Sequence, residues 1–207
     1  MPSIAYLLRR VRESLGQEGV GYTVKKMMWE VGEHICPPWH CLLWMPLSSV
    51  DGTSLQDSVT LRVISEPGGD IELAMLERSF GPSALSIFRA RVRQGCQLCV
   101  LFRGQAIAGT LFFVFGRTHR FQHHALTEQD AVILDARIAP EFRGQGLYSI
   151  FLNLSLGSLK GKEIERVFVA TSERNEPSLR ALRKVGFRHL MRYKTLMGIY
   201  KYDVNPL

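Results

Sequence analysis

The feature that most constrains the fold is an alternation, from Val59 onward, of short apolar segments with strand spacing and amphipathic segments with helical spacing. VTLRVIS predicts a strand, and IELAMLERSF and SALSIFRARVRQG predict two helices after it. CQLCVLF and QAIAGTLFFVFG predict two strands that flank a short turn at Arg103 and Gly104, and AVILDARIA predicts a third. The order is completed by a helix from Leu147 to about Lys160, a strand in RVFVATS, a helix in NEPSLRALRKVG, and strands in FRHLMRYK and MGIYKYDV. Interleaving of this kind predicts the α/β fold class, as a mixed (α+β) sheet with helices on both faces.

Residues 1–58 are expected to form a different kind of unit. Apolar residues recur at helical spacing from Ile4 to Leu15 and from Val24 to Ile35, which predicts two amphipathic helices. Basic residues beside these stripes would suit a membrane-surface anchor, but nearby glutamates almost cancel their charge, so we favour helices that pack on the main domain. WHCLLWMPL is a candidate strand and SSVDGTSLQDS a linker. We therefore expect an N-terminal helical extension over 1–58 and a main domain over 59–207, with the boundary near Ser58.

Length and charge narrow the class of protein. With 207 residues the chain is long enough for one domain with a small appendage. The net charge of +7 favours acidic partners, which include nucleic acid, anionic lipid and phosphate-rich small molecules. No apolar run approaches the roughly 20 residues of a spanning helix, and MPSIAYLL lacks the charged start of a secretory signal. We expect no membrane span and a cytoplasmic location, and association with a membrane surface stays open.

The cysteines are weak candidates for a metal or redox site. The four are Cys36, Cys41, Cys96 and Cys99. The last two have C-x-x-C spacing, but they lie in a predicted strand, where residues three apart point to opposite faces. The first two are flanked by His34 and His40 and separated by two prolines, so a metal knuckle is the alternative there. We favour buried, reduced thiols and predict no metal site.

The loop Arg143-Gly144-Gln145-Gly146 separates a predicted strand from a predicted helix. The first amides of a helix have no intrahelical partner, and the helix dipole adds partial positive charge at the same end. Two glycines let the backbone approach a ligand closely, and Arg143 adds a full positive charge. The loop therefore predicts an anion site that would accept a diphosphate, although two glycines can also serve turn geometry alone. It matches neither the P-loop nor the G-x-G-x-x-G pattern.

NEPSLRALRKVGF, about thirty residues further on, is a second motif. With both motifs, the chain from Val59 to Val204 resembles the GCN5-related N-acetyltransferase (GNAT) superfamily. The Arg143 loop is similar to the acyl-CoA pyrophosphate loop of that family, and NEPSLRALRKVGF to its Asn-started helix that ends in Gly-Phe. The resemblance implies a mostly antiparallel central sheet with a splayed strand pair. It also implies an N-acyltransferase that takes acetyl-CoA, or another acyl-CoA, as co-substrate and transfers the acyl group directly to a primary amine of a small molecule or sugar precursor.

The resemblance also assigns site residues. AVILDARIA should splay away from RVFVATS and open a notch for the pantetheine arm, whose amides would pair with strand groups. The Ile138 amide would donate to the thioester carbonyl, and Asn175 would contact the arm or order the reacting end. The residues expected to bind the cofactor are Ile138, Arg143, Gly144, Gln145, Gly146, Leu147, Tyr148, Asn175 and Ser178. The residues expected to take part in catalysis are Asp135, Ile138 and Asn175.

Several positions depart from the family pattern or leave a role open. Tyr148 stands where the pattern has Gly or Ala, and Leu182 stands where many members carry a tyrosine that protonates the leaving thiolate. Asp135 is the first candidate for the general base, and a structural salt bridge with a neighbouring arginine is the alternative. His123 and His124, in the loop before that strand, are further candidates for the base.

The acceptor side is less defined. Phe88, Arg91 and Gln94 lie where the family lines its acceptor pocket, but their spacing also suits a helix with one buried face. His40 and its neighbouring tryptophans in WHCLLWMPL would either stack on a sugar ring or complete the core. We expect a small-molecule amine as the acceptor.

Two other classes of function stay open. Leu182 is compatible with a catalytically silent GNAT-fold module that binds acyl-CoA or regulates a partner. The positive charge is compatible with a nucleic-acid or membrane-surface protein, but the sequence has no aromatic-basic RNA signature. We expect no nucleic-acid partner, and a monomer or a homodimer.

Overall fold

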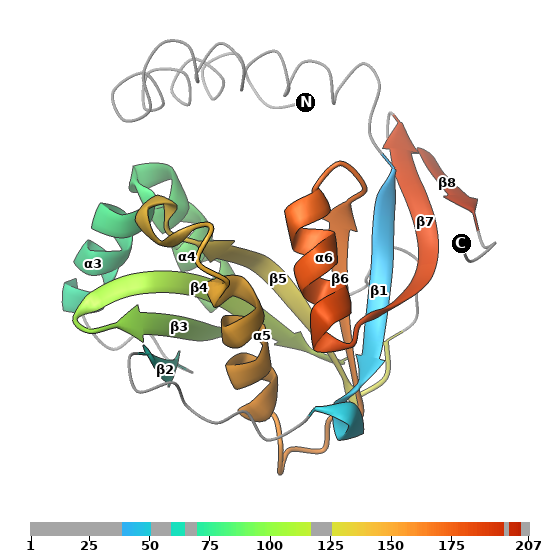
Figure 1. The fold of residues 1–207 in the computed structure, drawn as a ribbon, viewed down its shortest axis with the longest axis horizontal. Coiled ribbons are helices and arrows are strands. Elements are labelled where there is room, and N and C mark those ends of the chain that lie inside the picture. Colours follow the sequence, from blue (N-terminus) through green and yellow to red (C-terminus); the bar gives the residue numbers. More distant parts are fainter. Residues whose placement is uncertain (1–38, 51–58, 65–69, 117–125, 197–198, 204–207) are drawn as a thin grey trace.

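The computed structural model describes residues 39–50, 59–64, 70–116, 126–196 and 199–203 (Figure 1). Some of the expected features lie outside these residues. They are the two helices between Ile4 and Ile35, Cys36 of the metal knuckle, and the candidate bases His123 and His124. The helical nature of the N-terminal extension therefore stays a prediction.

From β2 onward the described elements have the types and the order that the sequence predicts. In chain order they are β1 (His40–Pro46), a 3-10 turn (Leu47–Ser49), β2 (Val59–Ile64), α3 (Asp70–Phe80), α4 (Pro82–Arg93), β3 (Gln97–Arg103), β4 (Ala106–Phe115), β5 (Asp130–Ile138), a second 3-10 turn (Pro140–Phe142), α5 (Leu147–Gly157), β6 (Arg166–Ser172), α6 (Glu176–Val185), β7 (Arg188–Leu196) and β8 (Ile199–Asp203). None of the helices in this part of the chain is long and apolar enough to cross a bilayer.

The strands of the described residues form one eight-stranded sheet in the order β2-β3-β4-β5-β6-β1-β7-β8. Neighbouring strands run antiparallel, except that β5 and β6 are parallel. Because parallel neighbours cannot be joined by a tight turn, a longer connection that contains α5 links these two strands. The mixed, mostly antiparallel sheet that the resemblance implies is confirmed.

The strand expected in WHCLLWMPL is present as β1, but it is not part of an appendage. β1 lies between β6 and β7, with His40 opposite Ser172 on β6 and opposite Tyr193 on β7. Residues 40–46, which the expected division assigned to the extension over 1–58, thus lie inside the sheet of the main domain. The pattern of a single apolar strand shows that it is buried, but not which strands it pairs with.

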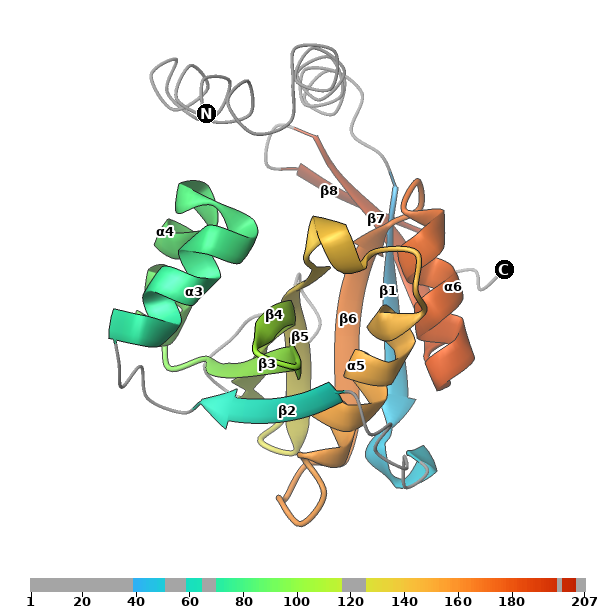
Figure 2. The ribbon, with the colours of Figure 1, turned by 60° about the vertical axis from the view of Figure 1, so that its left-hand side comes forward.

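Helices cover both faces of the sheet, with α3 and α4 on one face and α5 and α6 on the other (Figure 2). Alternate residues of a strand accordingly belong to different cores. Leu42 packs on the α3–α4 face, whereas Cys41 and Leu43 pack on the α5–α6 face. Cys96 and Cys99 are likewise divided between the two cores, as their spacing in the sequence predicts.

An ion pair between a buried carboxylate and a partly exposed arginine fixes one end of the parallel strands. The carboxylate of Asp130, which is fully buried, accepts hydrogen bonds from Nε of Arg166 and from the backbone N–H of Thr127, both at 2.7 Å. Burial acts to raise the pKa of Asp130, but the hydrogen bonds from Arg166 and Thr127 outweigh it and hold the pKa below its ordinary value. Asp130 and Arg166 face each other in the register of β5 and β6, so the pair clamps these strands at their first residues.

Candidate active site

β5 and β6 separate part-way along their length. Their register ends where Ile133 faces Val169, although β5 continues to Ile138 and β6 to Ser172. Close to this point Asp135 has a φ of 51°, which is uncommon for a residue other than glycine, and the pairing of β5 with β4 shifts register. An irregularity of this kind bends a strand and changes its direction. The splayed strand pair that the resemblance implies is therefore present.

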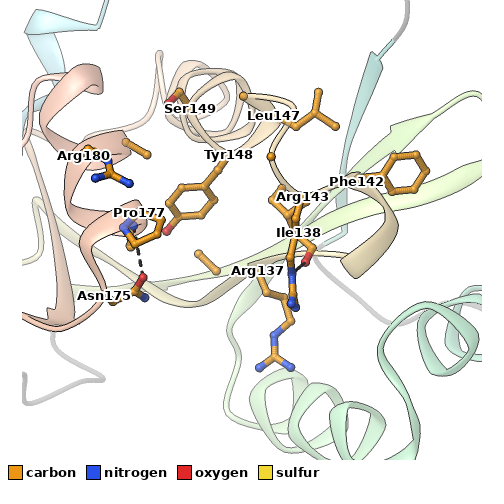
Figure 3. A pocket seen from close by; sticks show the side chains of 15 residues that line it. Arg137, Ile138, Phe142, Arg143, Leu147, Tyr148, Ser149, Asn175, Pro177 and Arg180 are labelled. Carbon is orange, nitrogen blue, oxygen red and sulfur yellow. Dashed lines mark hydrogen bonds between the residues drawn. The ribbon is translucent and has the colours of Figure 1, made fainter. Parts of the chain in front are cut away.

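The peptide groups of Ile138 face the notch between the two strands. The N–H of the next residue, Ala139, donates to the carbonyl of Ala108 on β4 at 2.9 Å. Consecutive residues of an extended strand direct their peptide groups to opposite sides, so those of Ile138 point away from β4. In agreement, the Ile138 carbonyl accepts a hydrogen bond from Nε of Arg143 at 3.1 Å (Figure 3). The Ile138 N–H is thus directed toward the space where the resemblance expects a thioester.

The loop from Arg143 to Gly146 leads into α5. Gly144 and Gly146 have φ values of 76° and 74°, in the left-handed region that favours glycine. A Cβ at either position would meet no atom within 4 Å, so backbone conformation rather than crowding requires glycine there. Gly146 is the N-cap of α5 and provides no side-chain cap. The first amides of α5 are therefore directed to solvent or to a ligand.

A second helix begins beside the first. Asn175 caps α6, because its Oδ1 accepts a hydrogen bond from the N–H of Ser178 at 3.3 Å. Tyr148, in the first turn of α5, and Ser178, in the first turn of α6, both line the space between the two helix starts. Burial raises the pKa of Tyr148, and the nearby Ser178 hydroxyl only partly opposes this, so the phenol stays protonated at neutral pH. Since Oδ1 of Asn175 caps the helix, its amide nitrogen is the atom left to donate to a ligand.

A cavity of about 720 Å³ lies between the Arg143 loop, the first turns of α5 and α6, and the end of β5 (Figure 3). Arg137, Arg143 and Arg180 line it, and no acidic side chain is among its described lining residues. Arg180 also pairs with Glu176 at 3.5 Å, in an exposed position. The volume is in the range of small-molecule sites, and the arginines and helix amides suit a diphosphate.

Eight of the residues predicted to bind the cofactor line this cavity. They are Ile138, Arg143, Gly144, Gly146, Leu147, Tyr148, Asn175 and Ser178. Gln145 does not line it, because its side chain bonds with Arg103 and with the carbonyl of Glu141. Seven lining residues were missed by sequence reasoning, and they include Arg137, Arg180 and Ala181. Ala181 follows Asn175 and Ser178 at intervals of three, a helical spacing from which its place on the same face of α6 could have been predicted.

Asp135 does not line this cavity, because its side chain points toward α4. Its Oδ2 accepts a hydrogen bond from Nε of Arg91 at 2.7 Å, and both side chains are about a quarter exposed. Arg91 also donates to Oε1 of Gln94 at 3.2 Å. The guanidinium of Arg137 lies on the same side, 6.0 Å from the centre of the Phe88 ring. The salt bridge that was the alternative for Asp135 is therefore present.

Leu182 is fully buried in the core under α5 and α6, so this position contributes packing and no proton donor. Among the described residues, no three or more His, Cys, Asp or Glu side chains are grouped in a way that could hold a metal ion.

Residues 70–187, more than half of the chain, match the sequence model of the acetyltransferase (GNAT) family. The chain belongs to this family. The matched region contains the splayed strands, the Arg143 loop and both helix starts around the cavity. Membership supports an acyl-CoA-dependent acyltransferase in general terms. No curated protein matches the sequence of this GNAT chain.

Solved structures share the fold of this GNAT chain. A tandem GNAT protein from the clavulanic acid biosynthesis pathway is similar with a TM-score of 0.57 and 17% identity, over 76% of this chain and 52% of that one. The glucosamine N-acetyltransferase region of a fungal multi-domain GH3 β-N-acetylglucosaminidase has a TM-score of 0.60 and 16% identity, over 84% and 22% of the two chains. A GNAT acetyltransferase from Colwellia psychrerythraea has a TM-score of 0.56 and 11% identity, over 81% and 56%. The chain thus spans about half the length of these proteins or less, and at such identities they share the fold alone.

Proposed function

We propose that this protein is an N-acyltransferase that uses acetyl-CoA as donor and transfers the acetyl group directly to a primary amine of a small molecule or sugar precursor. The observation that carries the proposal is the position of the cavity. It lies beside the end of β5 that has parted from β6, and it is lined at the same time by the starts of two helices and by three arginines. One site therefore offers a place for a diphosphate and a strand edge for an amide-bearing arm.

The residues of the cavity have separate tasks in this proposal. Arg143 and Arg180, with the first amides of α5, would hold the diphosphate. The part of β5 beyond Ile133 would pair with the amides of the arm as a strand does. The Ile138 N–H would donate to the thioester oxygen and stabilise the negative charge that develops there as the amine attacks. The amide nitrogen of Asn175 would contact the arm.

The described thiols support direct transfer over a covalent acyl-enzyme. Burial raises the pKa of Cys41 and of Cys99 to about 11, and it also raises the pKa of Cys96. A thiol attacks as its thiolate, so these buried groups are poor nucleophiles near neutral pH. They also do not line the cavity. Attack by the acceptor amine itself requires none of them.

Calorimetric titration with acetyl-CoA, followed by measurement of free thiol release with a panel of primary amines, tests the proposal. We expect saturable binding and thiol release that depends on the amine. A protein that binds no acyl-CoA would refute the assignment of the cavity.

A catalytically silent module is the second candidate, and the buried Leu182 is the observation that favours it. Such a module would bind acetyl-CoA in the same titration but would release no thiol with any amine. The two measurements together therefore separate the candidates. A nucleic-acid partner is not part of either proposal, and a monomer or a homodimer is compatible with both.

A further inference from the structure

His40, on β1, lies on the face of the sheet opposite the cavity. On β1 the residues Leu42 and Trp44 pack on the α3–α4 face, and Cys41 and Leu43 pack on the other. Because side chains alternate along a strand, His40 shares the face of Leu42 and Trp44. The stacking of its ring on Tyr193, which belongs to the same core, agrees with this placement, with ring centres 5.3 Å apart.

His40 also lies at the level of the notch. Ile133 faces Val169 at the last pair of β5 and β6, and Ser172 follows three residues later on β6, beside the parted end of β5. His40 is the register partner of Ser172. Neighbouring strands are about 4.8 Å apart, so roughly two strand spacings separate His40 from β5. The side chain between them on β6 is the small one of Ser172.

Positive and aromatic groups border this region from the other side. Arg137, which lines the cavity, extends to the α3–α4 face, where its guanidinium lies over Phe88. Asp135 and Arg91 form their ion pair on the same side. The notch therefore connects two faces: the cavity for the donor on the α5–α6 face, and a region bordered by His40, Ser172 and Arg137 on the α3–α4 face.

The chemistry of His40 suits proton transfer. Its Nδ1 is buried and has no hydrogen-bond partner among the described residues, although buried polar atoms normally have one. A neutral imidazole carries one nitrogen that can accept a proton. On this side Tyr193 from β7 contacts His40, and the other charged groups on the same face are Asp135 and Arg137 from β5 and Arg91 from α4. Asp135, the expected base, is already bonded to Arg91.

We propose that the acceptor amine binds on the α3–α4 face beside the notch, over Ser172, and that His40 is the general base of the reaction. This inference builds on the proposed function. The imidazole takes one proton from the ammonium group, directly or through one water, and the neutral amine attacks the thioester carbon. The C–N bond forms and the C–S bond breaks. The second proton of the nitrogen goes to the leaving thiolate, and His40 returns its proton to solvent.

Two substitutions at His40 separate a chemical role from a structural one. His40→Phe keeps an aromatic ring for Tyr193 but has no basic nitrogen, and His40→Gln keeps a polar group that does not titrate near neutral pH. If His40 is the base, both variants lower kcat/KM for the amine at pH 7 by about a hundredfold or more, within the range of general-base catalysis. The KM for acetyl-CoA stays unchanged, because His40 does not line the donor cavity.

The pH profile is the decisive readout, with ethanolamine, lysine and glucosamine as the amines. In wild type the acid limb of kcat/KM should level off at a lower pH than in both His40 variants. The rates of the variants should keep rising tenfold per pH unit until the amine itself has lost its proton, and should then approach wild type. Asp135→Asn should level off where wild type does. A shift of the limb in Asp135→Asn alone, or normal rates at pH 7 in His40→Phe, would overturn the assignment of His40.

Failure of the proposed function gives a different result. If wild type binds acetyl-CoA but releases no thiol with any amine, the protein is a silent module and His40 has no catalytic role. If the amine reaction proceeds and His40→Phe and His40→Gln match wild type from pH 6 to pH 9, the acyltransferase proposal stands and only the base assignment is overturned. Thermal unfolding of each variant shows that it is folded.

Discussion

Charge reversal at Arg143 is the sharpest test of the donor cavity. Two unit charges about 5 Å apart in water interact by about 0.8 kcal/mol. Arg143 is exposed, so the dielectric constant of water is the appropriate one. A diphosphate with two negative charges would gain about 1.6 kcal/mol from the arginine and lose about as much beside a glutamate. Arg143→Glu should therefore weaken acetyl-CoA binding by about 3.3 kcal/mol, a factor of about two hundred.

Calorimetric titration at low ionic strength measures this change, because salt screens an exposed charge. Arg143→Gln should cost only the lost attraction, a factor of about fifteen. Arg93→Glu is the matched control, since it makes the same change of net charge at an exposed position in the last turn of α4, outside the cavity. Equal affinities for Arg143→Glu and Arg93→Glu would refute the diphosphate site at this loop.

Three further predictions concern stability and reactivity. Gly146→Ala should destabilise the fold by about 1–2 kcal/mol because φ is 74° at this position. Gly157→Ala should not, since an added Cβ at this end of the same helix meets no atom within 4 Å. Urea unfolding of both variants compares the two free energies. The pKa of Asp130 is lower in the folded protein than in the unfolded chain, where it is about 4. The ion pair therefore stabilises the fold above about pH 4, and this stability is lost as pH falls through the pKa of the folded state. Asp130→Asn should therefore lower the free energy of unfolding by about 3 kcal/mol at pH 7, and this free energy should fall less steeply in acid than it does in wild type. The same pH dependence of the free energy of unfolding in both proteins would contradict this. With pKa values of about 11, Cys41 and Cys99 should be alkylated at pH 8 far more slowly in the native protein than after unfolding, as peptide mass mapping would show.

Local patterns carry most of the fold and of the donor cavity. The strand and helix periodicities predict each element from β2 to β8, and the glycines of the Arg143 loop have the positive φ that makes them necessary. Asn175 caps α6 and Gly186 ends it, as the sequence indicates. These signals are local, because each depends on residues within one or two turns of chain, and so a single sequence reveals them.

The remaining features depend on contacts between distant segments. The left-handed conformation of Asp135 interrupts AVILDARIA, whose alternation reads as a regular strand, because the bulge is set by the pairing with β4. The ion pair of Asp135 with Arg91 joins a strand to a helix far away in the chain. The place of His40 beside Ser172 follows from the insertion of β1 between β6 and β7, which no periodicity predicts.

The central position of β1 has a consequence for synthesis of the chain. β1 leaves the ribosome early, yet its partners are made much later: Cys41 and Glu173, which contact each other, are 132 positions apart. Until then Leu42, Leu43 and Met45, all fully buried in the finished sheet, have no strand to pack beside. Non-local pairing of this kind is slow, and exposed apolar segments promote aggregation during the wait. The nascent protein should therefore depend on a holding chaperone until β7 has been translated, and a chain truncated before β7 should aggregate.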